Sequence, residues 1–132
     1  MHFDIHWDEK FETGHPSIDF QHRVFFDLLQ NFAAEVKQGS DPAALRRLAI
    51  ELYKFADFHF FSEENIMLKI GYPEFAHHHG LHQALLHELR SYIESLVVEV
   101  PRGEDMLDYL TKWFVSHTAS EDLKLAVYVR TF

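Results

Sequence analysis

The stretch LRRLAIELYKFADFHFFSEENIMLKIG, residues 45–71, decides the fold because it carries one unbroken helical pattern. Its inward-facing positions recur every three or four residues, at Leu45, Leu48, Leu52, Phe55, His59, Glu63, Ile66 and Ile70. That period is typical of one face of an amphipathic helix. Gly71, followed by Pro73, marks the end of the pattern. The stretch therefore predicts one long helix.

Three further stretches show the same period. The pattern is carried by Ile18, His22, Phe25, Leu29, Phe32 and Val36, by His78, His82, Leu85, Leu89, Ile93 and Leu96, and by Leu107, Leu110, Phe114 and His117. All four patterns together predict helices over roughly residues 18–38, 42–70, 74–99 and 104–128. The connections between them are short, so neighbouring helices should run antiparallel. The predicted fold is all-α, an up-down-up-down four-helix bundle.

The chain has 132 residues, which is the length of one domain, and residues 1–132 are predicted to form a single domain. Residues 1–18 are expected to be an irregular N-terminal arm, because Gly14, Pro16 and Ser17 disfavour a helix there. Trp7 and Phe11 are large and apolar. We expect these two side chains to fix the arm to the body of the protein.

Composition excludes several classes of function. The 12 basic and 21 acidic residues give a net charge of −9, which argues against nucleic acid and against an anionic membrane surface as partners. The absence of cysteine excludes disulfides, thiolate metal sites and cysteine nucleophiles. No stretch approaches the ~18 to 20 apolar residues of a membrane span, and the N-terminus does not resemble a signal peptide. The expected location is the cytoplasm.

Polar residues occupy the apolar face of every predicted helix. A buried polar group without a partner costs roughly 1–3 kcal/mol, so five inward histidines need a common explanation, which a metal supplies. His59 and Glu63 are four residues apart and share one helix face, and so do His78 and His82. Asp122 follows His117 by five residues, about 140° around an ideal α-helix. We therefore expect Asp122 to reach the centre from the side, as a bridging carboxylate would.

The number of candidate ligands indicates which metal would fit. Five imidazoles and two carboxylates are too many for one zinc ion and too soft for calcium or magnesium, but they suit a pair of iron or manganese ions. If both carboxylates and a hydroxide bridge the pair, three histidines complete the coordination of one ion. The other two histidines then leave the second ion with one vacant coordination position. The remaining histidines are predicted not to be ligands: His2, His6, His15, His77, His79 and His87.

Five short motifs follow one another along the chain. They are W-x-x-x-F (Trp7, Phe11), I-D-x-Q-H (Ile18 to His22), H-x-x-x-E (His59, Glu63), G-Y-P followed by H-x-x-x-H (Gly71 to Pro73, His78, His82) and H-x-x-x-x-D (His117, Asp122). In these motifs the sequence resembles the hemerythrins, and most closely the single-domain bacterial hemerythrins. The resemblance implies a non-heme diiron site with an oxo or hydroxo bridge. Its implied ligands are His78, His82 and His117 for one iron, His22 and His59 for the other, and Glu63 and Asp122 as bridges.

The resemblance also implies that dioxygen binds at the iron held by His22 and His59. Helical spacing places Phe25, Phe60 and Phe114 near that position, where an apolar lining would exclude water. Thr118 follows His117 where the family more often has a bulky aliphatic residue. If Thr118 faces the oxygen pocket, its hydroxyl admits water or offers a hydrogen bond, and autoxidation should be faster than in an aliphatic variant.

The function predicted from these observations is reversible binding of dioxygen for storage or delivery, and not enzymatic catalysis. The alternative keeps the same diiron site in an oxygen- or redox-sensing domain of a signalling protein. An oxidase of the ferritin-like class would need paired E-x-x-H motifs on helices, and only Glu74 and His77 form one in a predicted helix. A metal-free structural bundle would leave the inward histidines unexplained. Expected partners are dioxygen and, unidentified, an oxygen-consuming enzyme or a fused signalling module.

Overall fold

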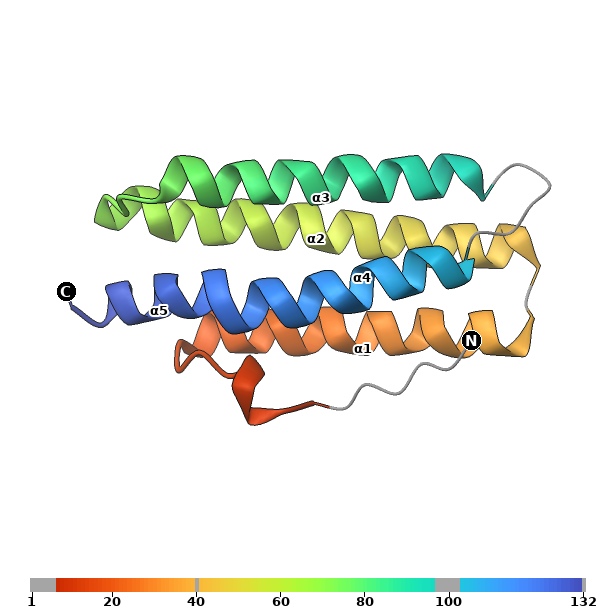
Figure 1. Cartoon of the computed structure of the whole chain (residues 1–132), viewed down its shortest axis with the longest axis horizontal. Coiled ribbons are helices and arrows are strands. Elements are labelled where there is room, and N and C mark those ends of the chain that lie inside the picture. Colours follow the sequence, from red (N-terminus) through yellow and green to blue (C-terminus); the bar gives the residue numbers. More distant parts are fainter. Residues whose placement is uncertain (1–6, 40, 97–102, 132) are drawn as a thin grey trace.

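The structure, a computed structural model, describes residues 7–39, 41–96 and 103–131. Four helical rods lie side by side (Figure 1): α1 (Pro16–Gln38), α2 (Pro42–Ile70), α3 (Phe75–Ser95), and a fourth in which α4 (Gly103–His117), a π-helical turn η2 (Thr118–Asp122) and α5 (Leu123–Val129) follow in line. Helix α2 packs against α1 and α3, and α1 packs against α4. The prediction of an all-α four-helix bundle is confirmed.

Capping residues set the helix boundaries. Asp41 caps α2 by accepting hydrogen bonds from the backbone N–H groups of Ala43 and Ala44. Helices α1 and α2 end directly before Gly39 and Gly71, whose φ angles of 71° and 67° suit residues without a side chain. Helix α1 begins at Pro16, earlier than the predicted residue 18, because proline is favoured at the first helical position.

Two other predicted boundaries differ from the structure. Helix α3 was expected over residues 74–99 but ends at Ser95, and residues 97–99 lie outside the described part of the chain. The fourth helix was expected to be continuous over residues 104–128. It starts at Gly103 and contains the π-helical turn η2 between α4 and α5. Two residues of this turn, Thr118 and Asp122, are buried, so the turn bears on the site.

The N-terminal arm lies along α1 (Figure 1) and contains a 3-10 helix, η1 (Glu9–Phe11), where an irregular chain was expected. Phe11 is 1% exposed, and the Trp7 ring lies 5.5 Å from the Phe11 ring and 5.7 Å from the Phe26 ring. Both aromatic residues therefore fix the arm to the bundle, as predicted. Residues 1–6 of the arm lie outside the described residues.

The apolar core has two parts. The larger one fills most of the bundle and includes Phe25, Phe60 and Phe114, whereas the smaller one includes Ile18 and Leu125 near the other end. On each of these helices the candidate ligands lie between residues of the two parts. The polar side chains thus occupy a layer that apolar packing closes on both sides. Within the described residues, no helix is both long and apolar enough to span a membrane.

Candidate metal centre

Seven inward side chains meet in this layer, and all are at most 5% exposed: His22 from α1, His59 and Glu63 from α2, His78 and His82 from α3, His117 from α4 and Asp122 from η2. They are the seven candidate ligands of the sequence analysis. Their ligating atoms fall into two groups, and within each group the atoms lie within 4.8 Å of one another. One group is His78, His82, His117, Glu63 and Asp122, and the other is His22, His59, Glu63 and Asp122.

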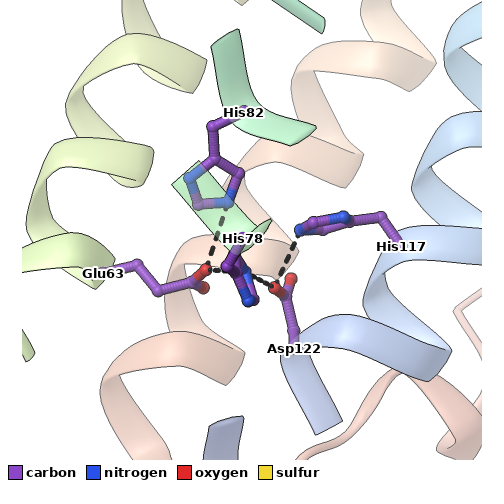
Figure 2. Close-up of side chains that lie close together, drawn as sticks. All are labelled: Glu63, His78, His82, His117 and Asp122. Atoms are coloured by element: carbon purple, nitrogen blue, oxygen red, sulfur yellow. Dashed lines mark hydrogen bonds and ion pairs between the residues drawn. The ribbon is translucent and has the colours of Figure 1, made fainter. Parts of the chain in front are cut away.

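Glu63 turns one carboxylate oxygen to each group. Its Oε1 lies 2.8 Å from Nε2 of His78 and 3.3 Å from Nε2 of His82. Its Oε2 lies 3.6 Å from Nε2 of His59, one turn earlier on α2. The side chains of the larger group point toward one another in Figure 2. A carboxylate divided in this way can ligate two cations at once.

Asp122 shows the same division from the opposite rod. Its Oδ1 lies 3.0 Å from Nε2 of His78 and 3.0 Å from Nε2 of His117. Its Oδ2 lies 2.8 Å from Nε2 of His22. The two carboxylates therefore face the same pair of positions from two sides, α2 and η2.

The π-helical turn explains how Asp122 comes to face inward. The spacing of five residues from His117 was interpreted on α-helical geometry, which predicted that Asp122 would not stack on His117 and would approach from the side. That interpretation was wrong in its geometry, because η2 spans Thr118–Asp122. A π-helix closes its hydrogen bonds over five residues, so residue i+5 returns to the face of residue i. The wider turn aligns Asp122 with His117.

Unsatisfied polar atoms test whether a metal fits this layer. Among the described residues, both ring nitrogens of His22, both carboxylate oxygens of Glu63, and Nε2 of His82 and His117 are buried without a hydrogen-bond partner. Such atoms are rare in folded proteins because each costs about 1–3 kcal/mol. A pair of cations between them would satisfy most of these atoms. The donor set therefore fits a metal pair.

Burial and neighbouring charges shift the pKa values of the side chains in this layer in different directions. Burial lowers the pKa of His59 to about 4, so near pH 7 this imidazole is neutral. Burial also opposes protonation of His78, but the hydrogen bond to Asp122 and the nearby charge of Glu63 outweigh it and raise the His78 pKa to about 10. Burial alone would raise the pKa of Asp122, but the charge of His117 and the hydrogen bond from His78 hold it well below its usual range. A bound cation would replace this protonic charge.

Two candidate ligands, His59 and His82, are hydrogen-bonded through Nδ1 to a side chain on a neighbouring helix. Nδ1 of His59 lies 2.6 Å from Oε1 of Gln21 on α1, and Nδ1 of His82 lies 2.8 Å from Oε2 of Glu64 on α2. Neither contact was predicted from the sequence. Glu64 directly follows Glu63, about 100° around α2, and Gln21 directly precedes His22. Neither placement shows which histidine of a neighbouring helix the side chain contacts.

A small cavity of about 10 Å³ adjoins one half of the layer. Its wall includes His22 and His59 together with all four residues predicted to line an oxygen pocket; the full set is His22, Phe25, His59, Phe60, Trp113, Phe114, Thr118 and Asp122. His78, His82 and His117 do not line it. Trp113 was not predicted, although its place four residues before His117 could have indicated it. The cavity therefore opens only to the half that has fewer imidazoles.

The histidines predicted not to be ligands lie elsewhere. His15 caps α1 through its ring, His77 and His79 are 58% and 43% exposed, and His87 is exposed. Neither metal-compatible group contains any of these four residues. His2 and His6 lie outside the described residues.

The fold is a four-helix bundle, and its buried layer consists of histidines and carboxylates. Both features place this protein in the class of helical proteins with a cation-binding site. The model of the hemerythrin HHE cation binding domain matches residues 13–129. The chain belongs to the hemerythrin family.

Named relatives and a solved structure agree with this assignment. The bacteriohemerythrin of Clostridium acetobutylicum is 26% identical over 121 residues, covering 88% of this chain and 94% of the relative. That of Campylobacter jejuni is 29% identical, with 84% of each chain covered, and the myohemerythrin of Theromyzon tessulatum is 26% identical, with 89% and 88% covered. The crystal structure of a wild-type hemerythrin superposes with a TM-score of 0.83 at 25% identity, covering 92% of this chain and 95% of the other.

Proposed function

We propose that this protein binds dioxygen reversibly at a pair of iron ions, for storage or delivery. The observation that carries the proposal is the division of the buried layer into two ligand groups that share Glu63 and Asp122, with a cavity against only one of them. Two ions with unequal numbers of imidazoles leave an open position on the side that the cavity adjoins. The cavity beside that position has room for about one water-sized molecule.

The ligand roles follow from the two groups and remain part of the proposal. One ion would be held by three histidines, the other by two, and both by the two shared carboxylates: His78, His82 and His117; His22 and His59; Glu63 and Asp122. Imidazole-rich sites suit iron, whereas magnesium and calcium prefer oxygen ligands alone. When bound, the iron pair supplies the two electrons needed to hold dioxygen reversibly.

The chain itself controls what reaches the pair. Phe25, Phe60 and Phe114 are each at most 4% exposed and form apolar walls of the cavity. A cavity of about 10 Å³ admits little more than one water-sized molecule, so larger substrates are excluded. Thr118 is 1% exposed and is the one residue with a hydroxyl among the described residues that line the cavity. We propose that the Thr118 hydroxyl admits water or a proton to the site and so speeds autoxidation of the iron pair.

Binding is favoured over catalysis by the composition of the site. The ferritin-like oxidases use carboxylate-rich sites built from E-x-x-H pairs. The only such pair in a predicted helix of this chain includes His77, which is 58% exposed and pairs with Glu121 instead of entering the layer. Five of the seven inward candidates are imidazoles. We therefore propose that the site carries dioxygen and does not activate it.

The test begins with iron content and the visible spectrum. Protein loaded with ferrous iron under argon should retain two irons per chain after desalting. Exposure to oxygen should produce a visible absorption band that disappears on degassing and returns over repeated cycles. A single irreversible change to the oxidised form would contradict reversible carriage, and a content of one iron per chain would contradict the pair.

A further inference from the structure

Two imidazoles of the buried layer, His59 and His82, are oriented by hydrogen bonds on their outer edges. Each presents Nε2 to Glu63 and turns Nδ1 outward to an oxygen of a neighbouring helix. An amide or carboxylate oxygen accepts a hydrogen bond, so Nδ1 carries the proton in both rings. Nε2, the atom that faces the centre, is then the nitrogen that each ring can offer to a metal. One of these imidazoles belongs to each of the two ligand groups.

The two acceptors differ in charge. His59 donates to the neutral amide of Gln21 over 2.6 Å, whereas His82 donates to the carboxylate of Glu64 over 2.8 Å. Hydrogen bonds to an ionised acceptor are roughly twice as strong as those to a neutral one. A carboxylate behind a ligating imidazole also makes that imidazole a stronger donor to the metal. The layer is therefore electronically unequal through its supporting residues as well as its ligands.

Glu64 is itself largely buried. Its side chain is 12% exposed, and its other oxygen, Oε1, lies 3.0 Å from Nδ1 of His79. The His82 ring is held on its face by Phe60, with ring centroids 3.9 Å apart and planes at 4°. The hydrogen bond to His82 therefore joins a largely buried carboxylate to a ring whose orientation is fixed by stacking.

We propose that Glu64 is a positioning residue that strengthens cation binding at the position of His78, His82 and His117, while Gln21 leaves the position of His22 and His59 weaker. The inference rests on the proposed function in taking these histidines as ligands. It assigns Glu64 and Gln21 opposite effects on two separate binding steps. The weaker, more labile position is then the one that adjoins the cavity.

The variants Glu64→Gln and Gln21→Glu test the proposal, because each keeps the shape of the side chain and changes its charge. Cobalt(II) is titrated into the metal-free full chain by calorimetry under argon. The wild type should show two binding steps. Glu64→Gln should weaken the tighter step about 10-fold and leave the other unchanged, and Gln21→Glu should strengthen the weaker step. The matched control is Glu51→Gln, an exposed charge change on the same helix, which should bind like the wild type.

A second readout does not depend on metal. In the metal-free chain, ¹⁵N-labelled histidine spectra should show a hydrogen-bonded proton on Nδ1 of His82 in the wild type and in Glu64→Gln, and its loss in Glu64→Ala. Equal weakening of both cobalt steps in Glu64→Gln, no weakening at all, or an unchanged His82 proton in Glu64→Ala would each overturn the proposal. If the wild type bound only one cobalt, the proposed function would fail, while the His82 proton would still decide whether Glu64 positions the ring.

Discussion

Replacing Asp122 with asparagine tests the shared carboxylates most sharply. Oδ2 of Asp122 lies 2.8 Å from Nε2 of His22, and Oδ1 lies 3.0 Å from Nε2 of His78 and of His117. The substitution keeps the size of the side chain but leaves one acceptor oxygen and one NH₂ group, which only donates. Asparagine can therefore ligate at most one of the two positions.

The size of the effect follows from the ligands that remain. The position of His78, His82 and His117 keeps three imidazoles and Glu63, whereas the other position keeps only two imidazoles and Glu63. Loss of a supporting residue costs 10–100-fold in metal affinity, and loss of a charged ligand should cost at least about 100-fold, or about 2.7 kcal/mol. We expect the weaker position to empty.

The assay is iron per chain after loading and desalting, together with the oxygen-dependent absorption band. Asp122→Asn should fall from two irons to one and lose the band. The control is Glu121→Gln, a neighbouring residue in η2 whose carboxylate lies 3.6 Å from His77 and 3.6 Å from Lys124 outside the layer. It should keep both irons. Two irons bound with wild-type affinity in Asp122→Asn would refute a bridging role for this residue.

Three further predictions concern the cavity, the arm and the metal. Thr118→Ile should slow autoxidation of the iron-loaded protein, because it replaces a polar residue that lines the cavity with an aliphatic one; equal decay rates would show that the hydroxyl plays no part. Asp19→Asn should lower the free energy of unfolding by about 1 kcal/mol near pH 7, because it weakens the hydrogen bonds that Asp19 accepts from Thr13 and Gly14. The loss is this small because solvent screens the partly exposed carboxylate. Burial alone would raise the pKa of Asp19, but these hydrogen bonds lower it in the folded protein. The contribution of Asp19 to stability is therefore present above the unfolded-state pKa of about 4 and should vanish as pH falls through the lower folded-state pKa. A stability difference between wild type and variant that does not change with pH between 2 and 7 would count against this. Removing iron with a chelator should lower the melting temperature measured by circular dichroism, because metal binds only the folded chain, and an unchanged melting temperature would argue against a buried site.

Helix positions could be predicted from the sequence because the residues that pack in the interior recur every three or four positions along each helix. The apolar stripe that includes Leu52 continues through His59 and Glu63, so the candidate ligands were found by the same period that found the helix. Glycines 39 and 71 then marked the ends of two helices. The pattern determines both the fold and which polar residues face inward.

Other features depend on geometry that a regular period does not carry. The π-helical turn before Leu123 has no signal in an α-helical period, so the alignment of Asp122 with His117 could not be derived from their spacing. Gln21 and Glu64 each contact a histidine on another helix, and that pairing depends on how the helices are rotated against one another. The cytoplasmic location and the identity of any protein partner stay predictions.

The most direct test of the central claim is a crystal structure of the iron-loaded protein with data collected at the iron absorption edge. The account predicts two anomalous peaks in the buried layer, one bonded to His78, His82 and His117 and the other to His22 and His59, with Glu63 and Asp122 bonded to both. A single peak, or two peaks of which each is bonded to only one of the carboxylates, would contradict it.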